Sequence, residues 1–138
     1  MSGAGMQEIE VKLLVHDLDD VARRIAAAGG VMTAPRVLER NVRYDNPAGD
    51  FATSGTVLRM RQDARARLTY KEGDKVIGVF GSARFEAEVE VSDYDAMAVI
   101  LQKLGYVPAW RYEKYRTTYS LMGTEVVLDE LPIGRFIE

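Results

Sequence analysis

The chain has 138 residues, of which 47% are hydrophobic and 28% are charged, and its formal net charge is −3. This length suits one domain with a core of its own, and the negative charge argues against a broad nucleic-acid-binding surface. The sequence has no cysteine and one histidine, His16, which excludes disulfides and a multi-histidine zinc site.

No apolar run approaches the length of about 18 residues that a membrane span needs, so no membrane partner is expected. Residues 1–5 lack the apolar region of a signal peptide, and a cytoplasmic location is the default expectation. An intrinsic metal site would have to use carboxylates, which are ligands that magnesium, manganese and calcium prefer.

The first predicted strand covers Gln7–Leu13. Alternation places Glu8, Glu10 and Lys12 on one face of it and apolar side chains on the other. Two carboxylates about 7 Å apart, followed by an ammonium group, can hold a divalent cation beside a polyanion. The same pattern is also typical of the solvated face of an outer strand.

The next elements follow from local signals. A helix is expected from a cap at Asp17 to about Ala28, before two glycines. A strand over 37–44 is followed by a turn at 45–50 and a loop that continues to Gly55. Further strands are expected at 56–61, 67–71 and 76–80.

The second half of the chain repeats this alternation. A strand is expected at 84–91, and Ser92 with Asp95 suggests the capped start of a second helix, which ends at Gly105. Strands are expected at 111–119, after Pro108, and at 125–130. The last residues look like the beginning of another strand.

Charged residues occur as same-sign doublets on these strands. Two like charges about 7 Å apart repel by about 2 kcal/mol at an effective dielectric constant near 20, so bringing acid doublets beside base doublets stabilises the fold. The opposite faces are apolar and need the two amphipathic helices as cover. The acid doublets are Glu8/Glu10 and Glu86/Glu88, and the base doublets are Arg59/Arg61 and Lys114/Arg116.

The fold class predicted from this pattern is α+β, with 1–138 as a single domain. An antiparallel sheet would roll into a closed or nearly closed barrel, a β-tunnel, with a charged interior and the helices packed outside. Clustered bases opposite clustered carboxylates indicate a multiply charged anion with a divalent cation. The predicted ligand is therefore a metal-bound di- or triphosphate.

The motifs and their order resemble the CYTH superfamily, which includes class IV adenylyl cyclases, thiamine triphosphatases and inorganic triphosphatases. The first strand is similar to that family's E-x-E-x-K signature. The other similar segments are Leu58-Arg59-Met60-Arg61, Thr69-Tyr70-Lys71, Glu86-Ala87-Glu88, Lys114-Tyr115-Arg116, and the run from Asp129 to Phe136-Ile137-Glu138. Together they span essentially the whole chain.

The resemblance implies a β-tunnel that binds a small-molecule triphosphate with Mg²⁺ or Mn²⁺. It implies phosphate binding by Lys12, Arg59, Arg61, Lys71, Lys114 and Arg116. It implies metal binding by Glu8, Glu10, Glu86, Glu88 and Glu138, and catalytic roles for Glu10, Lys12 and Glu88. For Asp129 two roles stay open, one at the site and one in ordering its strand. The family usually continues past the position of Glu138, so a C-terminal truncation or a minimal version is expected.

Two reactions fit such a site, the hydrolysis of a triphosphate and the cyclisation of ATP to cyclic AMP and pyrophosphate. The alternative is a non-catalytic module that binds polyphosphate or nucleotides. Trp110 and Tyr112 can either stack on a base or pack in the fold. The sequence leaves a homodimer open.

Overall fold

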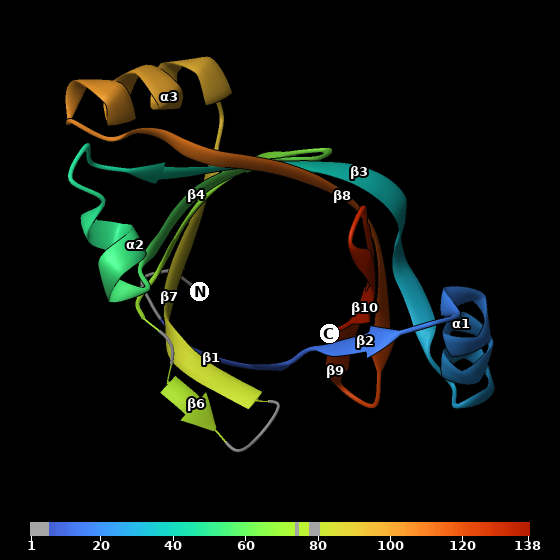
Figure 1. The fold of residues 1–138 in the computed structure, drawn as a ribbon. Coiled ribbons are helices and arrows are strands. Elements are labelled where there is room, and N and C mark those ends of the chain that lie inside the picture. Colours follow the sequence, from blue (N-terminus) through green and yellow to red (C-terminus); the bar gives the residue numbers. More distant parts are fainter. Residues whose placement is uncertain (1–5, 74, 78–80) are drawn as a thin grey trace. The chain divides into compact units, whose positions relative to one another are not determined.

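A computed structural model describes residues 6–73, 75–77 and 81–138 of the chain (Figure 1). Its elements, in chain order, are β1 (Met6–Val11), β2 (Leu13–Val15), α1 (Leu18–Ala27), β3 (Val31–Asp45), α2 (Asp50–Ser54), β4 (Val57–Gln62), β5 (Ala66–Lys71), β6 (Lys75–Ile77), β7 (Gly81–Val91), α3 (Tyr94–Lys103), β8 (Val107–Leu121), β9 (Thr124–Leu131) and β10 (Gly134–Ile137). Helices and a mainly antiparallel set of strands therefore make up an α+β fold, as predicted.

The chain divides into two compact units. Unit 1 consists of Met1–Glu10 and Arg40–Tyr112, and unit 2 consists of Val11–Glu39 and Glu113–Glu138. The two longest strands, β3 and β8, pass from one unit to the other. The strands belong to one sheet, and each unit has its own helical cover and its own buried hydrophobic cluster.

In unit 1 the strands follow the order β1-β7-β5-β4-β3-β8, and β6 pairs with β7. The pairings β3–β4, β4–β5 and β5–β7 are antiparallel. Helix α3 covers one face of this sheet (Figure 1). Its Leu101 packs with Val42, Tyr44 and Met60 in a buried cluster, because alternation sends these three strand residues to the same side. Met60 is fully buried.

In unit 2 the order is β3-β8-β9-β10-β2. The pairings β8–β9, β9–β10 and β10–β2 are antiparallel. Helix α1 supplies the cover here, since Ile25 packs with Tyr119 and Leu128 in a second buried cluster. In both units an amphipathic helix lies on the apolar sheet face, which confirms the role expected of the two helices.

The caps show how well local signals predicted the helix starts. Asp17 caps α1 as predicted, with its carboxylate accepting a hydrogen bond from the backbone N–H of Asp20 at 3.1 Å. The prediction for the second helix was wrong, because Asp93 caps α3, through the backbone N–H of Ala96. Both Ser92 and Asp93 are good caps, and backbone geometry placed the extended residue at 93.

The segment expected as a loop before Gly55 contains the short helix α2, which corrects that prediction. The buried Asp45 explains the helix, since its carboxylate accepts hydrogen bonds from the backbone N–H groups of Asn46, Phe51 and Ala52 at 2.8–3.0 Å. These contacts satisfy donors at the start of the helix that would otherwise lack partners. Burial by itself would raise the pKa of Asp45, but the three backbone donors lower it below its usual value.

Several strand boundaries also differ from the predictions. The first strand is interrupted at Lys12 and continues as β2. Strand β3 begins at Val31, well before the expected start, and β8 includes Pro108. The expected strand at 76–80 is β6 as far as Ile77, and its remaining residues lie outside the described part of the chain. Among the described helices, none combines the length and the apolar character needed to cross a membrane.

Candidate functional site

The polar face of the unit 1 sheet collects the predicted basic residues of β4 and β5. Antiparallel register places Arg59 opposite Thr69, and Lys71 opposite Glu86. Arg59, Arg61 and Lys71 are each only 7% exposed. Three cations are thus buried on the face that points away from α3, a placement that sequence alternation predicted.

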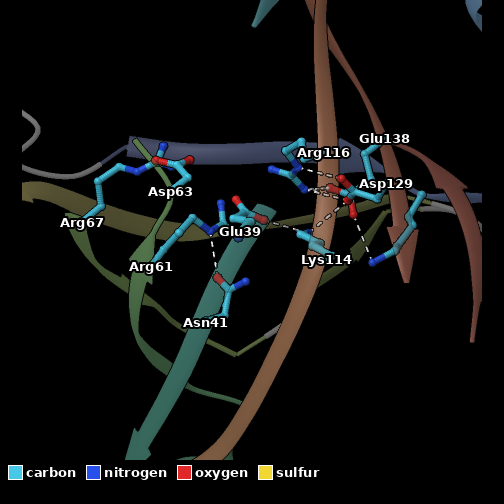
Figure 2. A network of polar contacts seen from close by, with 10 residues as sticks. Glu39, Asn41, Arg61, Asp63, Arg67, Lys114, Arg116, Asp129 and Glu138 are labelled. Atoms are coloured by element: carbon cyan, nitrogen blue, oxygen red, sulfur yellow. Dashed lines mark hydrogen bonds and ion pairs between the residues drawn. The ribbon is translucent and has the colours of Figure 1, made fainter. Parts of the chain in front are cut away.

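Some of these side chains have clear partners. The Arg61 Nε donates to the Asn41 Oδ1 at 2.9 Å (Figure 2), and Lys71 lies 3.6 Å from Glu86. The Thr69 hydroxyl donates to Glu88 at 2.7 Å. These contacts tie the polar side chains of β3, β4, β5 and β7 to one another across neighbouring strands.

Arg59 differs from its neighbours. Its Nε is buried without a hydrogen-bond partner, and within the described residues the structure gives its side chain neither a hydrogen bond nor an ion pair. Leaving a buried charged group unpaired costs several kcal/mol in general. A bound anion would remove that cost, and the structure gives the Arg59 guanidinium no other counter-charge among the described residues.

Unit 2 gathers charges in a different way. The carboxylate of Asp129, which is fully buried, accepts from Arg116 Nε at 2.7 Å and from Arg116 Nη2 at 2.8 Å (Figure 2). It also accepts from Lys114 Nζ at 3.0 Å. Asp129 therefore holds both basic side chains of the Lys-x-Arg element of β8.

The network of unit 2 extends to two more carboxylates. Lys114 lies 3.7 Å from Glu39, which is 1% exposed. Glu138 lies 3.0 Å from Lys12 and 3.6 Å from Arg116. The network therefore links three bases with three acids and has no net formal charge.

The pKa shifts follow this arrangement. For Lys114, burial and the neighbouring charge of Arg116 lower the pKa, despite the opposing effects of Asp129 and Glu39. For Asp129, burial by itself would raise the pKa, but the bonds and charges of Arg116 and Lys114 lower it. For Arg116, burial by itself would lower the pKa, but the hydrogen bond to Asp129 and the nearby acidic charges raise it. Arg116 and Asp129 are thus the tightly matched pair.

The residues predicted to act together fall into both units. Unit 1 contains Glu10, Arg59, Arg61, Lys71, Glu86 and Glu88, and unit 2 contains Lys12, Lys114, Arg116 and Glu138. The backbone of Glu8 belongs to β1, but its side chain lies outside the described part of the chain. Across the described residues, no group of three or more His, Asp or Glu side chains is arranged to hold a metal ion.

Sequence analysis missed two buried polar residues of β3, Glu39 and Asn41, which are each 1% exposed. A partial signal was present, because Asn41 and Arg43 alternate with the apolar Val42 and Tyr44, although the charged Arg40 breaks the pattern next to Glu39. It was overlooked because these residues carry no same-sign doublet. Thr69, which is fully buried and bonded to Glu88, also belongs to this polar face.

A family model for the CYTH domain matches residues 6–138. The chain belongs to the CYTH domain family. This CYTH chain is 27% identical over 135 residues to a protein of Methanocaldococcus jannaschii named "Putative adenylate cyclase", and the match covers 96% of this chain and 75% of the relative.

Solved structures match the CYTH chain over most of its length. A protein from Pyrococcus horikoshii has a TM-score of 0.77 at 24% identity, covering 96% of this chain and 75% of its own. A "Putative adenylyl cyclase" from Hippeastrum, described as having a dominant triphosphatase activity, has a TM-score of 0.71 at 21% identity, covering 96% and 78%. These matches confirm the predicted fold class, α+β with an antiparallel sheet of the tunnel-like CYTH kind.

Proposed function

We propose that this CYTH chain is a metal-dependent enzyme that binds a triphosphate and hydrolyses its terminal phosphate. The observation that carries the proposal is the unpaired, buried Arg59 beside Arg61 and Lys71 on the polar face of unit 1. Guanidinium groups bind phosphate oxygens through paired N–H donors. A triphosphate is an anion with enough charge to engage several such cations at once.

The roles of the unit 2 bases in this proposal come from the sequence resemblance. Lys12, Lys114 and Arg116 would bind phosphate oxygens in addition to the carboxylates that hold them now. Asp129 would keep Arg116 and Lys114 in place through its hydrogen bonds. Such preorganised donors stabilise charge on phosphate oxygens without reorganising during the reaction.

The carboxylates of unit 1 fit a magnesium or manganese ion. Glu86 and Glu88 lie on β7, and β1, which carries Glu10, is the hydrogen-bonded neighbour of β7. Mg²⁺ needs only one or two carboxylates, because phosphate oxygens and water complete its shell, so a cluster of three acids is not required. Glu10, Glu86 and Glu88 would hold the ion, with Glu8 and Glu138 as further sequence-based assignments, and the bound ion would supply charge neutralisation and a polarised water.

The chain's own groups would then position the reactants. Arg59, Arg61 and Lys71 would fix the phosphate chain, and the burial of these three side chains would limit the access of bulk water. Positioning and electrostatic stabilisation supply most of the rate enhancement in phosphoryl transfer. Cyclisation of ATP is the second candidate, favoured by the name of the Methanocaldococcus relative, while the Hippeastrum description favours hydrolysis.

Product analysis tests the proposal. The protein is incubated with tripolyphosphate and with ATP in the presence of Mg²⁺ or Mn²⁺, and we expect phosphate release. Formation of cyclic AMP and pyrophosphate would instead support the second candidate, the cyclisation of ATP. A metal-dependent stabilisation of about 2.7 kcal/mol at 100 times the dissociation constant, without any product, would identify a non-catalytic module and overturn both enzymatic functions.

Replacing Glu10 tests the metal assignment. We expect Glu10→Gln to lower metal-dependent turnover at least tenfold, about 1.4 kcal/mol in the barrier, while the dissociation constant for metal-free tripolyphosphate stays near that of the parent. Glu90→Gln is the matched control, because Glu90 is exposed and pairs with the exposed Arg65. Equal turnover in the parent and in Glu10→Gln would contradict the assignment.

A further inference from the structure

Strand β8 carries an aromatic pair in unit 1. Trp110 and Tyr112 are alternate residues of β8, with ring centroids 5.0 Å apart and ring planes inclined by 35°. The guanidinium of Arg43 lies 5.1 Å from the centroid of Trp110 and 5.9 Å from that of Tyr112. The three side chains form one cluster of two rings and a planar cation, which we call the aromatic cluster.

Register places the aromatic cluster on the polar face of the sheet. Arg43 pairs directly with Arg59 across β3 and β4, whereas its neighbours Val42 and Tyr44 belong to the core under α3. On β8 the residue between the two aromatics, Arg111, lies close enough to Tyr44 to affect its pKa. Arg111 and the core therefore share one face, and Trp110 and Tyr112 share the other with Arg43 and Arg59.

Burial alone does not explain this cluster. Trp110 keeps 56% of its surface exposed, although burying an indole is one of the largest apolar gains available to a fold. The Nε of Arg43 is buried without a hydrogen-bond partner, as is that of Arg59. Within the described residues neither arginine has a carboxylate partner, although like charges directly opposite on neighbouring strands repel.

An exposed ring beside two unmatched guanidinium groups suits a ligand with both a planar base and an anionic group. Every nucleobase presents a π-face, and stacking on aromatic side chains or on arginine contributes to binding with little dependence on sequence. Inorganic triphosphate can occupy the cations but leaves the ring face exposed.

We propose that Trp110, Tyr112 and Arg43 form a base-stacking platform that makes the chain select nucleoside triphosphates over inorganic triphosphate. The inference rests on the proposed triphosphate function, and it adds the chemical class of the substrate. Arg59, the cross-strand neighbour of Arg43, donates hydrogen bonds to phosphate oxygens while the base stacks on Trp110.

The test exploits Trp110 as the only tryptophan in the chain. Its fluorescence is recorded while the protein, with Mg²⁺, is titrated with ATP or with tripolyphosphate. Stacking of adenine on the indole should quench the emission, whereas tripolyphosphate should bind with little quenching. Calorimetry then gives both affinities for the parent and for Trp110→Leu, and we expect the variant to bind ATP about 5- to 100-fold more weakly and tripolyphosphate within twofold of the parent.

Two further variants control the experiment. Trp110→Phe keeps a ring and should retain most of the ATP affinity. Tyr115→Leu removes the aromatic partner of Arg36, whose guanidinium lies 3.7 Å from the Tyr115 ring centroid in unit 2, and should change neither affinity.

The outcomes separate the platform from the proposed function. If the parent binds tripolyphosphate at least as tightly as ATP, or if Trp110→Leu binds ATP as tightly as the parent does, the platform is overturned and the triphosphate function stands. An equal loss for both ligands would also overturn it, because the ring would then support the phosphate site rather than a base. If the parent bound neither ligand, the proposed function would fail and the platform with it.

Discussion

In unit 2 the buried Lys114 lies within 4 Å of two carboxylates, and Lys12 and Arg116 each have a carboxylate partner as well. Arg59 of unit 1 is as buried as Lys114 and has no such partner among the described residues. The six charged groups of the unit 2 network balance one another, whereas in unit 1 the Arg59 guanidinium has no counter-charge among the described residues. Neutral networks hold a fold together, while unmatched buried charge destabilises the free protein and favours a ligand. Unit 1 is therefore where anion binding should have its largest energetic effect.

Removing the central acid of unit 2 should produce the largest effect on folding. Asp129→Ala leaves Arg116 and Lys114 buried beside each other without their main counter-charge, so we expect a loss of about 3–5 kcal/mol in the free energy of unfolding. Urea denaturation measures it.

Glu130→Ala is the matched control for Asp129→Ala. Glu130 forms a bidentate pair with Arg36 at a more exposed position, and removing such a pair should cost less than about 1 kcal/mol. Similar losses in the two variants would mean that the buried network contributes no more than a surface pair.

Replacing the unmatched cation of unit 1 should have the opposite consequence for folding. Arg59→Met keeps the length of the side chain and removes a buried charge, so the free protein should be as stable as the parent or more stable. Its affinity for tripolyphosphate should fall about 10- to 100-fold, since hydrogen bonds to charged groups contribute about 1.5–3 kcal/mol.

Arg65→Met provides the comparison for Arg59→Met, because Arg65 is exposed and pairs with Glu90. It should leave both stability and affinity close to those of the parent, as measured by urea denaturation and calorimetry. Destabilisation of the free protein by Arg59→Met would show that a structural partner holds this guanidinium, and the contrast between the units would disappear.

Lowering the pH should weaken the unit 2 network and reduce the free energy of unfolding, by less than the Asp129→Ala substitution does. The pKa of Asp129 is lower in the folded protein, because Arg116 and Lys114 outweigh the effect of burial. A carboxyl group of this kind stabilises the fold above its unfolded pKa of about 3.9 and loses this contribution as pH falls through the folded value. Stability should therefore fall below about pH 4.

The contribution of Asp129 to acid sensitivity is measured by the slope of the free energy of unfolding against pH. We expect a shallower acid slope in Asp129→Asn than in the parent. The Asp45 carboxyl, whose pKa is also lowered, would leave a residual slope in that variant. Parallel slopes for Asp129→Asn and the parent would assign the acid sensitivity to other groups.

Alternation along single strands was enough to predict which side chains share a face. It correctly placed Arg59, Arg61 and Lys71 together, and the helical spacing of apolar residues correctly placed Leu101 on the face of α3 that covers the sheet. The CYTH family was indicated separately, by the resemblance of motifs that lie in order over nearly the whole chain, and the family model confirms it. These features depend on neighbours within a few residues, and local geometry determines them.

Other features depend on contacts between residues far apart in the chain, and local patterns could not predict them. Nothing near Asp129 in the sequence indicates that it would bind Lys114 and Arg116, and nothing near Glu39 indicates its burial against Lys114. The helix α2 likewise depends on a carboxylate at Asp45, several residues before it. In each case the partner is specified only when strands pair and a buried charge must find its counter-charge.

The sequence by itself thus determined most of the elements, their apolar and polar faces, and the family. Tertiary structure alone decided which charges are neutralised and which are not, because that depends on the register between strands and on burial. It made Asp129 the centre of a neutral network in unit 2 and left Arg59 without a counter-charge in unit 1. The strength of an electrostatic interaction is set by distance and local polarity, and the order of residues along one strand specifies neither.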